Sequence, residues 1–196
     1  MGGTTGSRLQ LAGVLSAGSL ASGSVAPGEI ITLIGSGIGP AAAAQPASSA
    51  RSLSLGGTSV LLDGKPAPLL SAAPNQINAL LPYGVSGQDV TQMLVMSVGQ
   101  VIAGFPLSVA PSVRAIFTVD ASGVGPGAIL TRDSTINSPS NPAKRGRWWC
   151  SSTTGTGQSD SPALPGTLAL SRRQSGKSDC RRLADRERLL HRRMSR

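Results

Sequence analysis

Short apolar segments alternate with turn residues along the first 110 residues of the chain. The apolar positions follow a period of two or run without interruption over the length of a strand, and they show no period of 3.6. Gly, Pro and Asp, which favour turns, separate the segments. We therefore predict strands at 30–34, 58–62, 76–81, 89–97 and 101–109, with a short edge segment at 68–70 and a first strand within 9–21.

Two turns predict how neighbouring strands connect. Asp63-Gly64 is a pair typical of a tight turn, and Val98-Gly99-Gln100 joins the last two strands into a hairpin. Strands at this spacing, with turns between them, indicate an all-β fold of the β-sandwich type. A signal peptide at 9–21 is the alternative to the first strand, and we disfavour it because Gly13 and Gly18 interrupt the apolar run.

The net charge of +9 lies wholly after residue 143. Up to Ala143 five basic residues balance five acidic ones, whereas Lys144 to Arg196 contains 13 basic and four acidic residues. A basic segment favours a polyanionic partner, and residues 181–196 could form a basic helix that binds nucleic acid or an anionic membrane. We prefer a disordered tail and disfavour nucleic acid as a partner. No apolar run reaches the roughly 18 residues that span a bilayer, so we expect no transmembrane segment.

Residues suited to catalysis or metal binding are scarce. The single histidine, His191, lies in the basic tail, so a catalytic triad or a metal cluster built on histidine is not expected. Asp63, Asp120 and Asp133 each lie within two residues of Gly or Ser, which predicts turns, with calcium ligands as the alternative. We predict that the protein is not an enzyme and that it binds no cofactor.

Gln76, Asn78 and Tyr83 form the predicted ligand-contact surface. Gln76 and Asn78 are two residues apart, so their side chains lie on one face of a strand, and Tyr83 follows nearby. Amide and phenol groups of this kind could bind a sugar or a peptide strand. The alternative, which we favour, is that they satisfy hydrogen bonds of neighbouring loops.

Several strings along the chain carry a resemblance to a known family: VAPGEI at 25–30, GSGIGP at 35–40, DGKPAPLL at 63–70, QINALLPYG at 76–84, AIFT at 115–118, GAIL at 127–130 and NSPSNPAKRG at 137–146. On these strings, residues 13–146 resemble the uncharacterised C-terminal domain family named after Solibacter. The first hundred residues also resemble the wider IPT/TIG pattern. The resemblance implies an immunoglobulin-like sandwich at the C-terminus of a larger secreted bacterial protein, located outside the cell or at its surface. It implies no activity.

The sequence departs from the family after Gly146. The family would continue with an apolar strand, where RWWCSS stands at 147–152, and nothing matches from Arg172 onward. We hypothesise a shift of reading frame near residue 146 or 171, with a diverged native tail as the alternative. Without that strand, residues 111–146 are predicted to pack only partly, and Cys150 and Cys180 to be unpaired.

These observations predict four parts: an N-terminal extension at 1–12, an immunoglobulin-like sandwich at 13–110, an incomplete second β unit at 111–171, and a basic tail at 172–196 that is disordered or partly helical. The function that they favour is a non-catalytic extracellular module for adhesion or protein interaction. Its partners would be neighbouring domains or cell-surface proteins. A carbohydrate-binding module with glycans as ligands is the alternative, and nucleic-acid binding through the tail is a second alternative.

Overall fold

The predicted all-β architecture is confirmed. The computed structural model describes residues 10–47, 52–131, 133–144, 149–158 and 170–171, and these contain strands and one short 3-10 turn, η1 (Tyr83–Val85). The strands are β1 (Gln10–Ser16), β2 (Ile30–Ser36), β3 (Thr58–Leu62), β4 (Lys65–Pro66), β5 (Leu69–Ala73), β6 (Gln76–Leu80), β7 (Val90–Ser97), β8 (Gln100–Ser108), β9 (Ala115–Ile116), β10 (Ile129–Thr131), β11 (Trp149–Thr154) and β12 (Leu170–Ser171).

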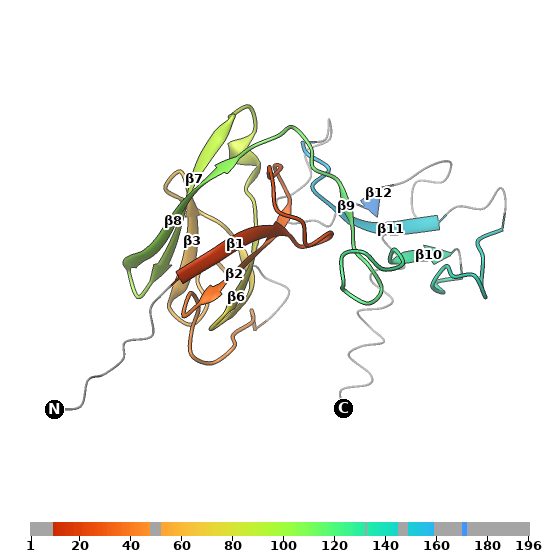
Figure 1. Cartoon of the computed structure of the whole chain (residues 1–196), viewed down its shortest axis with the longest axis horizontal. Coiled ribbons are helices and arrows are strands. Elements are labelled where there is room, and N and C mark those ends of the chain that lie inside the picture. The colour runs from red at the N-terminus through yellow and green to blue at the C-terminus, as the bar shows by residue number, and fades with distance from the viewer. Residues whose placement is uncertain (1–9, 48–51, 132, 145–148, 159–169, 172–196) are drawn as a thin grey trace.

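Two antiparallel sheets form the larger part of the molecule, which lies on the left in Figure 1. One sheet has the strand order β1-β2-β6-β5 and the other has the order β4-β3-β7-β8. Their facing side chains form one hydrophobic cluster, to which Leu33 and Ile77 contribute from the first sheet and Val60 and Met93 from the second, all fully buried. Because both sheets share this core, they pack face to face as a sandwich.

The strand pairs follow from local turn chemistry. The predicted hairpin is confirmed, since β7 pairs with β8 across the turn Val98-Gly99, and both turn residues have positive φ (48° and 79°). Asp63-Gly64 forms the equivalent tight turn between β3 and β4, with φ of 48° and 76°. Positive φ at both central residues is the geometry of a type I′ turn, whose twist matches that of the flanking strands.

The two edge strands of the first sheet, β1 and β5, lie where the sequence predicted strands, but their bounds differ from the prediction. β5 is the edge strand expected at 68–70, but it continues to Ala73. β1 is the first strand expected within 9–21, and it begins at Gln10, inside the segment that we assigned to an N-terminal extension. Its register with β2 explains this early start, because Gln10 already pairs with Ser36.

The prediction that a strand is missing after residue 146 was wrong. β11 (Trp149–Thr154) pairs with β9, β10 and β12, so it is the central strand of the third sheet. The sequence of β11 lacks the apolar residues of a typical buried strand, but Ser151, Thr153 and Thr154 are buried there as small or β-branched side chains. Such residues fit a pleated sheet without a large core.

The prediction of unpaired cysteines was also wrong for Cys150. This residue lies on β11, is buried and is disulfide-bonded. Cys180 lies outside the described residues, as do His191 and the predicted basic tail.

The second β unit contacts the sandwich near Gly18 and Ile30. Thr154 at the end of β11 accepts a hydrogen bond at its Oγ1 from the backbone N–H of Ile30, at 2.7 Å. Gly18 lies close to both Ala115 and Thr154, so that a Cβ on Gly18 would be 2.8 Å from the Ala115 Cβ. The buried core cluster ends at Leu107, so no described residue of the second unit belongs to it.

Candidate functional site

Asn78 is the centre of a polar network on the outer face of the first sheet. Its Oδ1 accepts hydrogen bonds from Thr32 Oγ1 at 2.8 Å and from Gln76 Nε2 at 3.3 Å, and its Nδ2 donates to Ser71 Oγ at 3.0 Å. Thr32, Asn78 and Ser71 lie directly opposite one another on β2, β6 and β5. The network therefore joins three strands, and it brings together Gln76 and Asn78, as their spacing predicted.

Tyr83 does not belong to this network. It begins η1, beyond the far end of β6 from Gln76, and its ring lies over Gly28, where an added Cβ would be 2.7 Å from the Tyr83 hydroxyl. Tyr83 comes after the end of β6 at Leu80, whereas Gln76 begins that strand. The structure therefore separates Tyr83 from the two amides with which we grouped it.

The geometry of this network bears on ligand binding. The Asn78 carbonyl oxygen already accepts two hydrogen bonds from neighbouring side chains, so a ligand that donates to it would have to replace one of them. Gln76 remains exposed at the end of β6. A contact role for Gln76, Asn78 and Tyr83 stays a prediction. The hydrogen bonds of Gln76 and Asn78 join side chains within the sheet, whereas the alternative that we favoured expected them to satisfy neighbouring loops.

The outer face of the second sheet has a different character, and the sequence analysis did not identify it. The register pairs Leu61 with Leu94 and Met96 with Val101 on this face. Leu61, Leu94 and Met96 are half-buried, and Val101 is 57% exposed. We call these four residues the apolar face. The signal was present in the sequence, because β7 carries apolar residues at both alternating sets of positions over its second half.

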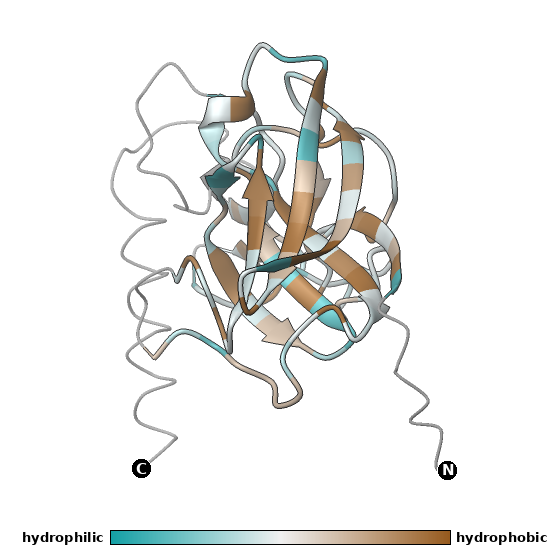
Figure 2. Cartoon of the chain, turned by 90° about the vertical axis from the view of Figure 1, so that its left-hand side faces the viewer, coloured by the Kyte–Doolittle hydropathy of each residue, from teal (hydrophilic) through white to brown (hydrophobic). Residues whose placement is uncertain are grey.

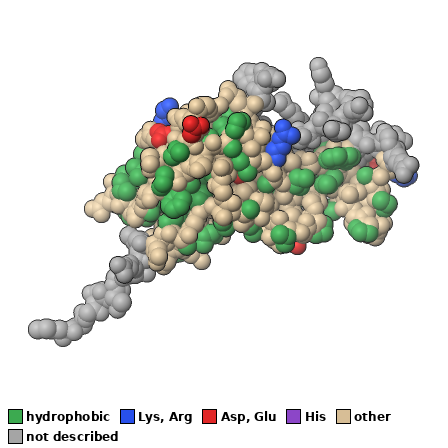
Figure 3. Space-filling view, turned by 45° about the horizontal axis from the view of Figure 1, so that its top comes forward, with side chains coloured by type: hydrophobic (Ala, Val, Ile, Leu, Met, Phe, Trp, Pro, Cys, Tyr) green, Lys and Arg blue, Asp and Glu red, His purple; other side chains and the backbone are tan. Residues whose placement is uncertain are grey.

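The surroundings of the apolar face are uncharged. The residues that the register adds to the same side of the sheet are Ser59, Pro66, Val90, Gln92, Gly104, Pro106 and Ser108. Leu94 lies over Gly104, where an added Cβ would be 3.1 Å from Leu94 Cδ2. Figure 2 views the molecule from the side on which β3, β7 and β8 lie in Figure 1, and hydrophobic residues recur along these strands. Figure 3 shows another side, where hydrophobic side chains lie among uncharged ones with few charges between them.

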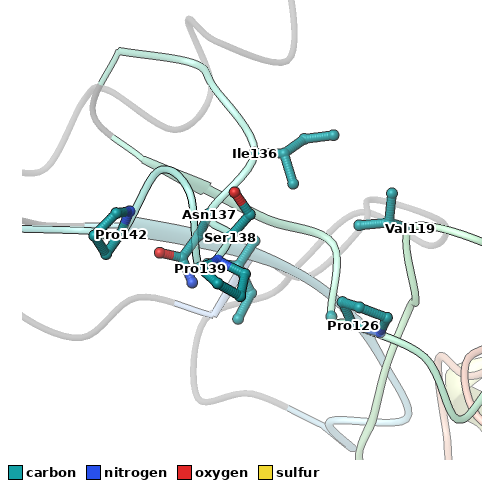
Figure 4. A pocket seen from close by; sticks show the side chains of 9 residues that line it. Val119, Pro126, Ile136, Asn137, Ser138, Pro139 and Pro142 are labelled. Carbon is teal, nitrogen blue, oxygen red and sulfur yellow. The ribbon is translucent and has the colours of Figure 1, made fainter.

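A shallow apolar pocket of about 600 Å³ lies in the second β unit. In Figure 4, Val119 and Pro126 lie across from the segment that carries Ile136, Pro139 and Pro142. The side chain of Asn137, which also lines the pocket, accepts a hydrogen bond at its Oδ1 from the Ala143 N–H at 2.8 Å. This bond holds the loop and uses one of the two lone pairs of the Asn137 carbonyl oxygen.

The aspartates take the turn roles that the sequence predicted for Asp63 and Asp120. Asp63 accepts hydrogen bonds from Thr91 Oγ1 at 2.7 Å and from the Gln92 N–H at 2.9 Å, and these bonds lower the pKa of its carboxyl group. The hydroxyl and N–H of Ser122 lower the pKa of Asp120 in the same way. Among the described residues no group of three or more His, Cys, Asp or Glu side chains could hold a metal ion.

Comparisons with known proteins assign neither a family nor a function to the chain. No family model matches the chain, and no curated protein matches it. Similar solved structures include an auxiliary nutrient binding protein from Bacteroides thetaiotaomicron VPI-5482 and one from Bacteroides ovatus ATCC 8483, both 10% identical. The matches cover 56% and 58% of this chain, span only 22% and 24% of those chains, and have TM-scores of 0.33 and 0.32. Similarity at this level carries no argument about function. In the described part of the chain, no helix is long and apolar enough to cross a membrane.

Proposed function

We propose that the chain is a non-catalytic, extracellular β-sandwich module for adhesion or protein interaction, and the C-terminal part of a larger secreted bacterial protein. The observation that carries this proposal is the apolar face, where Leu61, Leu94, Met96 and Val101 form an uncharged surface on an open sheet. The proposed occupant is a similar apolar sheet face of another folded module, and a second copy of this chain is the occupant that can be tested directly.

The strand order supports an immunoglobulin-like module. The sheets β1-β2-β6-β5 and β4-β3-β7-β8 correspond in chain order to strands A-B-E-D and C′-C-F-G of immunoglobulin-like domains. This correspondence agrees with the resemblance to the IPT/TIG pattern and to the Solibacter-type family, which remains part of the proposal. The extracellular location rests on the same resemblance.

The chemistry of the apolar face favours protein over the other partner classes. Nucleic acids and anionic membranes are recognised through clustered Lys and Arg, and this face carries neither. A sugar site usually presents an aromatic ring, and no aromatic side chain lies on this side of the sheet. A flat, uncharged sheet can pack on a second sheet without like-charge repulsion.

The size of the face predicts a weak contact. The four strands have 2, 5, 8 and 9 residues, and at about 3.3 Å per residue and about 4.8 Å between strands they cover roughly 400 Å². Stable protein complexes bury about 800 Å² on each partner, so a single contact of this size is expected to be transient. Weak contacts of this kind give strong adhesion when many copies are presented on one surface.

Sedimentation velocity of the full chain tests the proposal. We expect the weight-average sedimentation coefficient to rise between about 10 μM and about 1 mM, the range of weak association. Val101→Lys should raise the dissociation constant by about tenfold, because it places a charge in the apolar contact. Leu70→Lys is the matched control, since Leu70 is 37% exposed on the edge strand β5 of the other sheet, and it should leave the constant unchanged.

Salt gives the second test. The chain carries a net charge of +9, so higher salt should strengthen the apolar association of two copies by screening their repulsion. A wild-type chain that stays monomeric at the highest concentration would overturn the proposed self-contact. Equal weakening by Leu70→Lys and Val101→Lys would assign the contact to a different surface.

A further inference from the structure

Glu29 is the one charged side chain among the described residues that is fully buried. It ends a tight turn, in which its N–H donates to the Ala26 carbonyl at 3.1 Å and Gly28 has a φ of 74°. Glu29 Oε2 accepts a hydrogen bond from the Ala26 N–H at 2.8 Å. Because the turn and the side chain hold each other, the carboxyl group is fixed at the end of the sandwich, just before β2.

The second β unit covers this carboxyl group. A Cβ on Gly155 would be 3.4 Å from Glu29 Cδ, so the backbone of Gly155 lies against the acid. The neighbouring Thr154 accepts the Ile30 N–H, and the Gly155 carbonyl accepts the Val113 N–H at 2.8 Å. We call Thr154 and Gly155 the cover. The core cluster contains no described residue of the second unit, so the cover lies outside the core.

The environment of Glu29 favours its neutral form. Burial raises the pKa of its carboxyl group, and the hydrogen bond from the Ala26 N–H opposes that increase. Glu29 Oε1 and Ser16 Oγ are both buried without a hydrogen-bond partner. An ionised carboxylate would therefore be held away from water with one hydrogen bond, which is unfavourable.

Other titratable groups near the acid do not compensate its charge. The ring of Tyr83 lies over Gly28 next to Glu29, and Arg114 follows Val113 on the segment paired with the cover but is exposed. Neither side chain contributes to the pKa shift of Glu29. Ionisation of the acid thus has to be accommodated by water, and water reaches it when the cover opens.

We propose that Glu29 makes the junction between the sandwich and the second β unit sensitive to pH: the cover is docked while Glu29 is neutral and opens when Glu29 ionises. The direction follows from proton linkage. The closed state binds the proton more tightly than the open state, so closure is most stable below pH 4.5, the ordinary pKa of a glutamate. The stability of the closed state falls as the pH rises from 4.5 to the pKa that Glu29 has in the closed state. Above that pKa the stability no longer changes with pH. This behaviour would let the second unit change position between acidic and neutral surroundings.

Amide hydrogen exchange of the full chain tests this inference between about pH 4 and about pH 9. The reporter is the Ile30 N–H, which donates to the cover, and the reference is the Ala17 N–H, which donates to the Ile30 carbonyl at 2.9 Å. After correction for the intrinsic rate, protection at Ile30 should fall by up to about tenfold per pH unit, since one proton is lost. Protection at Ala17 should not change.

Two variants separate this mechanism from general destabilisation. Glu29→Gln keeps the shape without the charge and should make protection at Ile30 independent of pH. Asp63→Asn removes an exposed carboxylate of the β3–β4 turn and should leave the wild-type profile unchanged. A flat wild-type profile, or a slope that persists in Glu29→Gln, would overturn the inference.

A direct titration keeps the test independent of the variants. The ¹³C shift of the Glu29 carboxyl carbon in the wild-type chain should titrate above pH 4.5, and the decline in Ile30 protection should end at that midpoint. If Glu29→Gln does not fold, these two wild-type measurements decide the question. A midpoint at or below 4.5 would contradict the inference.

Discussion

The sandwich and the second β unit bury different kinds of side chain. In the sandwich, Leu33, Val60, Ile77 and Met93 meet between two sheets and are fully buried. In the second unit most buried side chains carry a hydroxyl group, namely those of Thr131, Ser151, Thr153 and Thr154. Burying an aliphatic side chain contributes about 1.5–3 kcal/mol, and a hydrogen bond contributes about 1 kcal/mol net. The comparison indicates that the sandwich determines global stability and that the second unit opens more easily.

The largest expected effect comes from truncating one apolar residue in each region. Ile77→Ala should lower the free energy of unfolding by about 2–5 kcal/mol, because it leaves a cavity between two packed sheets. Ile129→Ala in β10 should cost less than about 1 kcal/mol, because this side chain is only half-buried. Urea unfolding followed by far-ultraviolet circular dichroism measures both. Equal losses would show that the two regions share one level of stability.

A smaller effect, confined to the second unit, is expected for Gly155→Ala. Gly155 has a φ of 69°, and an added Cβ would overlap the Val113 carbonyl oxygen. We expect the variant to lose about 1–3 kcal/mol of local stability, since the backbone must leave this conformation. Hydrogen exchange should show lost protection at Val113 and Ile30, with the core strands unchanged. Gly64→Ala is the control for positive φ alone, because nothing lies within 4 Å of its Cβ position.

The smallest effect is a gain in stability at the hairpin turn of the sandwich. Val98 is 83% exposed and has a φ of 48°, which is unfavourable for a β-branched residue. Val98→Asn should raise the free energy of unfolding by about 0.5–1 kcal/mol, because Asn tolerates this conformation before a glycine. Thermal unfolding measures the gain. An unchanged or lower melting temperature would mean that Val98 makes a contact that outweighs its backbone strain.

The strands of the sandwich could be predicted because their signal is local. The run at 30–34, the turn Asp63-Gly64 and the hairpin around Val98-Gly99 each specify their own conformation. β11 was missed because Ser and Thr, which fill most of it, have no apolar pattern, and only its three partner strands explain why they are buried.

The candidate surfaces depended on pairings between distant residues. The apolar face becomes visible only when the register places Val101 beside Met96 and Leu94 beside Leu61. Glu29 follows a Pro-Gly turn, where an acid is expected in water, and its burial results from a segment about 125 residues further along the chain. Local patterns contain no information of this kind, because burial here depends on which segments meet in the fold.

The isolated parallel bridge between Val25 and Val109 has a mechanical consequence. The Val25 N–H donates to the Ser108 carbonyl at 2.8 Å, and the Ala110 N–H donates to the Val25 carbonyl at 2.9 Å. These bonds join the segment that enters β2 to the segment that leaves β8 in the same direction. Tension applied between the Val25 and Val109 segments would load both bonds at once in shear, whereas an antiparallel pair opening from its end would break one bond at a time. The bridge thus gives the exit of the sandwich a contact that resists pulling with two bonds together.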